Sequence, residues 1–138
     1  MITISVCMIV KDEEMVLERA LKSVERIADE IIIVDTGSTD RTKKIALKYT
    51  DKVYDFVWCD DFAKARNYSF SKATMDYCMW LDADDIISDS NQEGLINLKK
   101  TLSKDTSVVM MKYNAEFDQN NKPTFTYYRA RLIRRKDN

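Results

Sequence analysis

Short apolar runs and longer amphipathic segments follow one another along most of the chain. The apolar runs cover Ile2–Val10, Glu30–Val34, Val53–Trp58 and Tyr77–Leu81. Continuous apolar runs of this length are typical of strands that are covered on both faces of a sheet. The segments between them carry apolar residues at helical spacing. This alternation of strand and helix predicts an α/β fold with a parallel sheet.

Helices are expected in the segments that separate the apolar runs. We expect Asp12 to cap the first helix, which buries the apolar positions that recur at helical spacing: Val16, Leu17, Ala20, Leu21, Val24 and Ile27. The next two helices are expected over residues 41–49 and 62–73. A fourth is expected from a cap at Ser90 or Asn91 to about residue 102.

The last part of the chain has the pattern of a hairpin. Ser107–Tyr113 and Thr124–Ile133 read as strands, and the polar run Asp118–Pro123 between them reads as a turn. We therefore expect one domain of three layers, α/β/α, whose mostly parallel sheet ends in an antiparallel pair. The arginines near the end are interpreted as an exposed charge run that protects a sheet edge: Arg129, Arg131, Arg134 and Arg135.

The charge balance excludes several classes of function. The chain has 22 Lys and Arg residues against 23 Asp and Glu residues, and its formal net charge is -1. No basic block favours nucleic acid or an anionic membrane surface as a partner. The chain also has no His, so histidine-based acyl-transfer triads and His-containing zinc sites are excluded.

The three cysteines indicate the compartment of the protein. Cys7, Cys59 and Cys78 lie singly, without C-x-x-C spacing, among apolar or aromatic neighbours. An odd number of scattered cysteines favours buried, reduced thiols over a disulfide framework or a structural zinc site. Because no export signal or membrane span is visible either, we expect a cytoplasmic protein.

Acidic residues follow three of the four predicted parallel strands, at the point where each strand ends. They are Asp12–Glu14, Asp35 and Asp82–Asp85. In open α/β sheets, ligands bind beyond the carboxyl ends of the strands. We therefore expect these carboxylates to meet at one edge of the sheet, where their mutual repulsion calls for a cation or a hydrogen-bonding ligand.

Asp82 and Asp84 are the candidate metal ligands. Two residues apart at a strand end, they can point to the same side, and Mg²⁺ or Mn²⁺ prefers one or two carboxylates completed by phosphate oxygens and water. Such an ion would neutralise charge on a leaving nucleoside diphosphate, which indicates group transfer. The residues alone equally allow a second interpretation, in which Asp82–Asp85 only caps the next segment.

The segment after the second predicted strand is not a phosphate-binding loop of a known glycine-rich type, because the whole chain has two glycines. Asp35 can accept a hydrogen bond from the imide N–H of uracil or from a similar donor on another base. Ser38, Thr39 and Asp40 are interpreted as turn and N-cap residues. Arg66, on the helix before the fourth predicted strand, can offset the acidic cluster or bind a diphosphate.

Four motifs together resemble the family 2 glycosyltransferases. They are Cys7–Glu14, Asp29–Thr42, Ala65–Asn67 and Trp80–Asp85, and their order and spacing match over roughly the first 90 residues. The resemblance extends to the branch that includes bacterial lipooligosaccharide β-1,4-glucosyltransferase-like proteins. In that branch a K-[ND]-E-E opening, a D-[ST]-G-S-T-D loop and an L-D-A-D segment occur together.

This resemblance implies a GT-A fold and inverting transfer of a sugar, usually from a UDP-sugar, with Mg²⁺ or Mn²⁺ as cofactor. The site residues that it implies are Val10, Lys11 and Glu13 at the nucleotide pocket, Asp35 at the base, Arg66 near the donor, Asp84 at the metal and Asp82 at ribose or sugar. The acceptor is left open among a saccharide, a lipid-linked glycan and a polypeptide.

Two departures from the family pattern matter. Where Pro-Thr-Tyr-Asn is frequent, this chain has Ile9–Asp12, so an aromatic contact to the base is missing. The family also places its catalytic base well beyond the D-x-D motif, whereas Glu116 and Asp118 are poor candidates because of their turn-like surroundings. We therefore expect residues 1–138 to be the donor-binding portion of a longer glycosyltransferase, with any docking at a membrane made by other regions.

Two alternatives belong to other classes of protein. A binding or scaffold module could keep a transferase-like sheet without transferase activity. A receiver-like signalling domain would also gather acidic residues and Mg²⁺ at strand ends, but it needs a phosphorylatable Asp at the end of its third strand. Here that strand runs into Trp58 and Cys59, which is a poor match.

Overall fold

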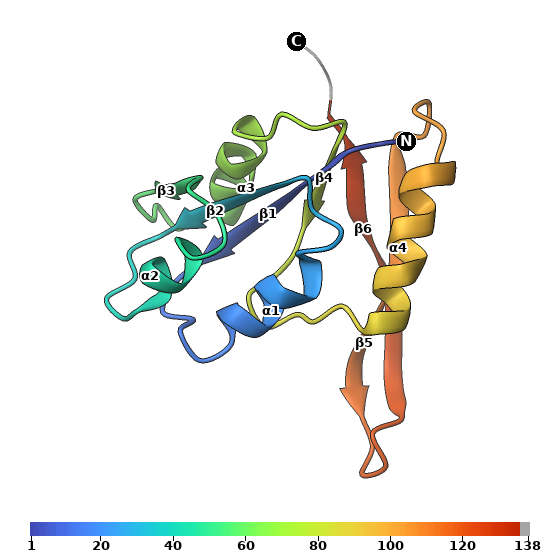
Figure 1. The fold of residues 1–138 in the computed structure, drawn as a ribbon. Helices are drawn as coiled ribbons and strands as arrows, with labels where there is room; N and C mark the ends of the chain where they lie inside the picture. The colour runs from blue at the N-terminus through green and yellow to red at the C-terminus, as the bar shows by residue number, and fades with distance from the viewer. Residues whose placement is uncertain (136–138) are drawn as a thin grey trace.

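A six-stranded sheet with the strand order β3-β2-β1-β4-β6-β5 forms the centre of the fold. It is seen in a computed structural model that describes residues 1–135 and, at 113–116 and 123–128, the backbone alone. Helices α1, α2 and α4 lie on one face and α3 on the other (Figure 1). The elements are β1 Ile4–Val10, α1 Leu17–Val24, β2 Glu30–Asp35, α2 Thr42–Ala46, β3 Val53–Asp55, α3 Phe62–Ser71, β4 Tyr77–Trp80, α4 Asp89–Thr101, β5 Val108–Phe117 and β6 Pro123–Arg134.

Strand β1 lies between its two parallel partners, β2 and β4. Val10 at its end is in register with Asp35 of β2, and Cys7 is in register with Trp80 of β4. The chain builds outward from β1 to β2 and β3, then returns to add β4 on the opposite side of β1. Such a reversal opens a crevice at the carboxyl ends of the two strands, where ligands bind in open α/β sheets.

Side chains of the central strands enter the core on alternate faces. In β1, Ile4, Val6 and Met8 pack with α1 and α4 in one apolar cluster, whereas Cys7 belongs to a second cluster on the α3 face. A strand that is covered on both faces needs apolar side chains at both sets of positions. The continuous apolar runs therefore predicted these strands correctly.

The predicted antiparallel pair is also confirmed. Strand β6 pairs with β4 on one side and with β5 on the other, and the β5–β6 hairpin extends beyond the rest of the sheet (Figure 1). Arg131 of β6 is buried, with 6% of its surface exposed. The interpretation of the four arginines as an exposed run that protects a sheet edge is therefore wrong, because β6 is an interior strand and presents Arg131 to the end of β4. Arg129, Arg134 and Arg135 are partly buried.

Several predicted boundaries differ from the structure. Strand β3 has three residues, because it lies at the edge of the sheet and has one partner, β2. Helix α2 ends at Ala46. Helix α4 begins two or three residues earlier than predicted, and Ser88 is its N-cap, accepting the Asn91 N–H at 3.3 Å. Asp12 does not cap α1, since it lies in a turn with a φ of 51°.

The cysteines are free, as expected, but their burial differs. Cys7 and Cys78 are buried on adjacent strands, whereas Cys59 is exposed in the loop before α3. The expectation of three buried thiols is therefore wrong for Cys59, because β3 ends before it and leaves it outside the sheet. Within residues 1–135, none of the helices has the length and apolar character needed to cross a bilayer.

A buried carboxylate joins the strands at the edge opposite the carboxyl ends. Glu30 of β2 accepts hydrogen bonds from the hydroxyls of Ser5 and Thr74 at 2.8 and 2.7 Å, and it is paired with Lys52. Burial raises the pKa of Glu30, but the hydrogen bonds from Lys52, Thr74 and Ser5 outweigh burial and lower this pKa to about 2. This network ties β1, β2 and the start of β4 together.

Candidate functional site

The loops after β1 and β2 are joined by hydrogen bonds at the carboxyl edge of the sheet. The Asp12 N–H donates to Oγ of Ser38 at 2.9 Å, and the Thr39 N–H donates to Oδ1 of Asp12 at 2.8 Å. The Glu13 N–H donates to Oγ1 of Thr42 at 2.7 Å. Ser38 and Thr39 therefore link the two loops, in addition to the turn that they were expected to form.

Glu13 brings the first loop beside the loop that follows β4. Burial raises the pKa of the Glu13 carboxyl, and the negative charges of Asp84, Asp40 and Asp82 raise it further. These carboxylates come from three different connections in the chain. Carboxylates from the loops after β1, β2 and β4 therefore act on one another at this edge, but the loop after β2 contributes Asp40, and the predicted Asp35 is not among the charges that act on Glu13.

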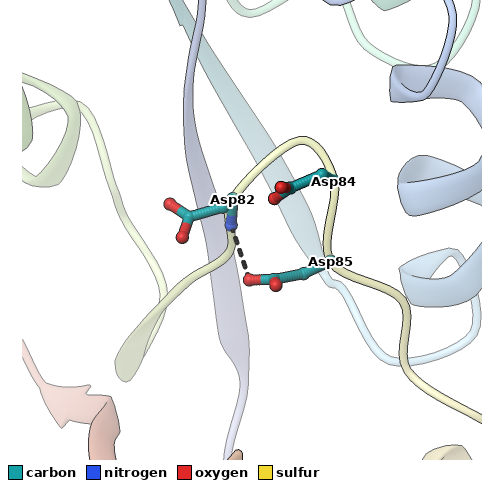
Figure 2. A group of neighbouring side chains, drawn as sticks. All are labelled: Asp82, Asp84 and Asp85. Carbon is teal, nitrogen blue, oxygen red and sulfur yellow. Dashed lines mark hydrogen bonds between the residues drawn. The ribbon is translucent and has the colours of Figure 1, made fainter. Parts of the chain in front are cut away.

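Three aspartates crowd the loop after β4. Asp82, Asp84 and Asp85 each offer a carboxylate oxygen, and these oxygens lie within 4.8 Å of one another. Figure 2 shows that the Asp84 side chain reaches back across the loop, whereas the Asp82 carboxylate points away from Asp84. The loop is closed by a hydrogen bond from the Asp82 N–H to Oδ2 of Asp85 (Figure 2). A second hydrogen bond runs from the Asp85 N–H to the Asp82 carbonyl.

The electrostatics of this loop suit a hard divalent cation. Burial raises the pKa of Asp82, and the charges of Asp85 and Asp84 raise it further, while Arg131 partly offsets them. Asp84 is exposed and Asp82 is partly buried, so one carboxylate is accessible and the other is held in place. Oxygen donors of this kind are the ligands that Mg²⁺ and Mn²⁺ prefer, so the accessible Asp84 carboxylate fits such an ion. Asp82 does not point to the same side as Asp84, as the spacing predicted it could (Figure 2).

Asp35 presents an acceptor that has no partner among the described residues. Its carboxylate is buried, with 4% of the residue exposed. Oδ1 accepts the N–H groups of Gly37 and Ser38 at 2.9 and 2.8 Å, whereas Oδ2 is buried without a hydrogen bond. Gly37 closes this turn with a φ of 116°, which a residue with a Cβ rarely adopts. A buried unpaired carboxylate oxygen is costly, so it marks Asp35 as a candidate contact for a hydrogen-bond donor.

Arg66 lies on the α3 side of the same edge. Its guanidinium carbon is 4.2 Å from the centroid of the Trp80 ring and 4.9 Å from that of Phe62. Burial lowers the pKa of Arg66, and the Asp82 charge opposes that change. The Arg66 Nε is buried and has no hydrogen-bond partner within the described part of the chain, and a small hollow lies between Arg66, Ile9 and Asp82. The positive charge of the Arg66 guanidinium therefore lies at the same edge of the sheet as the aspartates.

The remaining predicted site residues lie around the first loop. The Val10 side chain is buried in the core, and the Val10 carbonyl accepts the Thr36 N–H at 3.0 Å. Lys11 is exposed. Only the backbone of Val10 is therefore oriented toward the loops, while Lys11 and the partly buried Glu13 present their side chains at the edge.

Asp85 and Arg131 are the residues of this site that sequence reasoning missed. Asp85 belonged to the acidic segment, but no spacing rule connects it with an arginine 46 positions later. A second hollow, of about 580 Å³, lies on the α4 side of these two residues and is lined mainly by apolar side chains of β4, α4 and β5. Of the two weak candidates for a catalytic base, Asp118 holds the hairpin turn by accepting the Asn120 and Lys122 N–H groups, and the Glu116 side chain lies outside the described residues.

The amino-acid sequence of this chain matches a known protein family and related proteins. The sequence model of Glycosyl transferase family 2 matches residues 5–138. A TPR repeat-containing protein of Synechococcus elongatus is 47% identical over 85 residues, which cover 62% of this chain and 21% of that protein.

Solved structures share the fold. The crystal structure of S. aureus TarS 1-349 matches with a TM-score of 0.59 and 27% identity, over 69% of this chain and 30% of that TarS chain. The glucosyl-3-phosphoglycerate synthase of Mycobacterium tuberculosis, in complex with Mg²⁺ and UDP, matches with a TM-score of 0.54 and 26% identity, over 62% of this chain and 34% of the synthase. These likenesses confirm the predicted GT-A fold class. The chain spans about a fifth to a third of the length of these three proteins.

Proposed function

We propose, because this chain belongs to glycosyl transferase family 2, that residues 1–138 form the nucleotide-sugar-binding portion of a glycosyltransferase that uses a UDP-sugar. The observation that carries the proposal is the meeting of carboxylates from separate loops at the carboxyl edge of the sheet, with Glu13 beside Asp84 and Asp82. The M. tuberculosis synthase, which this chain resembles, was crystallised with UDP and Mg²⁺ and with UDP-glucose and Mn²⁺. The lipooligosaccharide branch of the family stays a prediction.

Asp35 and Arg66 are the proposed contacts to the nucleotide. The unpartnered Oδ2 of Asp35 would accept the imide N–H of uracil, which satisfies both groups. Arg66 would lie near the donor diphosphate, where its planar guanidinium can bind oxygens in pairs. Val10 and Lys11 would line the nucleotide pocket through the first loop, with Glu13 facing the aspartates.

Asp84 is the proposed direct ligand of a divalent cation, Mg²⁺ or Mn²⁺, and Asp82 is proposed to meet the ribose or the donor sugar. Asp84 is the more exposed of the two, so it can complete the shell of an ion that also binds phosphate oxygens. When bound, such an ion would act as a Lewis acid on the diphosphate leaving group. Asp82 would orient the donor from its partly buried position.

The proposed reaction is sugar transfer with inversion. Inversion requires a base that deprotonates the acceptor hydroxyl on the face opposite the leaving group. Because Asp118 is engaged in the hairpin turn, we propose that this base comes from outside the chain described here. The acceptor would be a saccharide, a lipid-linked glycan or a polypeptide, and the proposed compartment is the cytoplasm, with any peripheral membrane docking through other regions.

Calorimetric titration tests the donor site directly. UDP, GDP and CDP are titrated into the protein with and without Mn²⁺. We expect UDP to bind more tightly than the other two, Mn²⁺ to strengthen binding, and Asp84→Ala to remove the effect of Mn²⁺. Asp105→Ala, an exposed aspartate in the loop after α4, is the control and should keep it. Indifference to every nucleotide would overturn the proposal and leave the scaffold module as the explanation.

The receiver-like alternative does not fit the sheet. A receiver-type sheet has the order 2-1-3-4-5, which puts its third strand in the interior. Here β3 lies at the edge of the sheet, and Asp55 at its end is exposed and paired with Lys43. The strand order and the position of Asp55 therefore argue against a receiver-like domain, in agreement with the family match.

A further inference from the structure

Arg131 of β6, which lies far from β4 in the sequence, is hydrogen-bonded to the loop after β4. Its Nη1 donates to Oδ2 of Asp85 at 3.1 Å and to the Trp80 carbonyl at 3.2 Å. The same Oδ2 of Asp85 accepts the Asp82 N–H at 3.1 Å. One carboxylate oxygen thus connects the guanidinium of the hairpin with the backbone at which the acidic loop begins.

The Arg131–Asp85 pair is buried. Their side chains are 7% and 10% exposed, whereas the Arg26–Glu93 pair lies at the surface with both side chains more than half exposed. Removing one member of a buried pair leaves an uncompensated charge that the protein cannot solvate in place. The buried ion pair with Arg131 therefore stabilises the observed geometry of the loop around Asp82 and Asp85.

Trp80 connects the Arg131–Asp85 pair with Arg66. The guanidinium carbon of Arg131 is 3.9 Å from the centroid of the Trp80 ring, and that of Arg66 is 4.2 Å from it. The indole N–H donates to the Ala130 carbonyl at 2.7 Å, which fixes the ring against β6. A shift of Arg131 would therefore reach both the acidic loop and Arg66.

We propose that Arg131, acting through Asp85, is a positioning residue that sets the geometry of the Asp82–Asp85 loop for binding a divalent cation together with a nucleoside diphosphate. This inference rests on the proposed function, and it adds the closing hairpin to the donor site. Arg131 touches neither nucleotide nor cation in this proposal. It orients the groups that do, in the way that residues behind a metal ligand determine the position of that ligand.

The test compares Arg131→Met, Arg131→Lys and Asp85→Asn in calorimetric titrations of UDP with and without Mn²⁺. We expect Arg131→Met to weaken Mn²⁺-dependent UDP binding by about 10- to 100-fold and to weaken metal-free UDP binding less, because without the cation only the contact of Trp80 with Arg66 transmits the change. Arg131→Lys should restore part of the loss, because an ammonium can reach Asp85 but does not reproduce a planar guanidinium. The double variant Arg131→Met with Asp85→Asn should be no weaker than the single variants, since both break one connection.

Two controls separate positioning from general stability. Arg134→Met removes an arginine of the same strand that donates to the Lys104 carbonyl, away from the loop. Lys99→Met removes a mostly buried lysine paired with Asp29. Both should keep the Mn²⁺ effect, and Lys99→Met should do so although it lowers the melting temperature. An unchanged Mn²⁺ effect in Arg131→Met, or an equal loss in Lys99→Met, would overturn the inference.

Amide hydrogen exchange provides a measurement that needs no ligand. The Asp82 N–H is held by Asp85, so its exchange should accelerate in Arg131→Met and Arg131→Lys but not in Arg134→Met. Slow exchange of the Asp82 N–H in every variant would refute the inference that Arg131 positions this loop. If the wild-type protein binds no UDP, the proposed function fails, and exchange at Asp82 still decides whether Arg131 positions the loop.

Discussion

Asp12 and Thr39 are joined by a hydrogen bond in which Oδ1 of Asp12 accepts the Thr39 N–H at 2.8 Å. This bond connects the loop after β1 with the loop after β2, and it requires Asp12 to adopt a φ of 51°. Asp and Asn enter this left-handed region more readily than other residues with a Cβ. The acidic residue after β1 thus has a structural role in holding the edge together, apart from any contact with a ligand.

Asp12→Asn should therefore be tolerated, and Asp12→Ala should not. Asparagine keeps both the Oδ1 acceptor and the preference for a positive φ, whereas alanine loses both. We expect Asp12→Ala to lower the free energy of unfolding by about 1–3 kcal/mol, measured by urea denaturation. Equal stability of the two variants would show that the Asp12–Thr39 bond contributes nothing.

Asp35→Asn tests the unpartnered carboxylate oxygen. The amide oxygen can still accept the Gly37 and Ser38 N–H groups, but an NH₂ group replaces Oδ2 and opposes the imide N–H of uracil. We expect UDP binding to weaken by about 1–3 kcal/mol in calorimetry, with little change in melting temperature. Asp55→Asn is the matched control, because Asp55 is in register with Asp35 on the neighbouring strand and is exposed. UDP affinity that Asp35→Asn leaves intact would contradict the assignment.

Asp84→Asn tests whether the acidic edge is strained without a cation. Neutralising Asp84 relieves its repulsion of Glu13 and Asp82, so the metal-free variant should be more stable than wild type by a few tenths of a kcal/mol, about the size of an exposed charge interaction. Mn²⁺ should raise the melting temperature of the wild type by mass action and leave that of Asp84→Asn unchanged. A rise of the same size in both proteins would place the ion elsewhere.

Glu30 should make the protein sensitive to acid. Its pKa is lowered from 4.5 to about 2 in the folded state, so below about pH 4.5 the unfolded chain binds a proton that the folded protein does not. The stabilisation, of order 3 kcal/mol, is present above about pH 4.5 and is lost as the pH falls toward 2. Urea unfolding across this range should show a shallower pH dependence for Glu30→Gln than for wild type, and parallel curves would contradict the assignment.

Leu21→Ala tests the core beneath the site. Leu21 of α1 is fully buried against the sheet, and truncation of such a side chain leaves a cavity. We expect a loss of about 2–5 kcal/mol in the free energy of unfolding. Met15→Ala, at a position that is 90% exposed, should lose little. Similar losses in both variants would mean that α1 is not packed as described.

The order of elements, the parallel sheet and the aspartates at the strand ends could all be read from the chain. Each rests on a local pattern, because a strand covered on both faces, such as β1, needs a continuous apolar run, and a strand end is marked by the first polar residues after it. The carboxyl edge then follows from the general geometry of parallel sheets. Asp82 and Asp84 could therefore be chosen as candidate site residues from the sequence.

The role of Arg131, the turn at Asp12 and the short edge strand β3 could not be read in this way. Each depends on which segments become neighbours in the sheet, and that is decided by packing over the whole domain. Arg131 looks like one of four similar arginines until β6 is placed beside β4, where burial makes Asp85 its ion-pair partner. Apolar periodicity reports which face of an element is covered, but the partner of a buried charge is set by contacts between residues far apart in the chain.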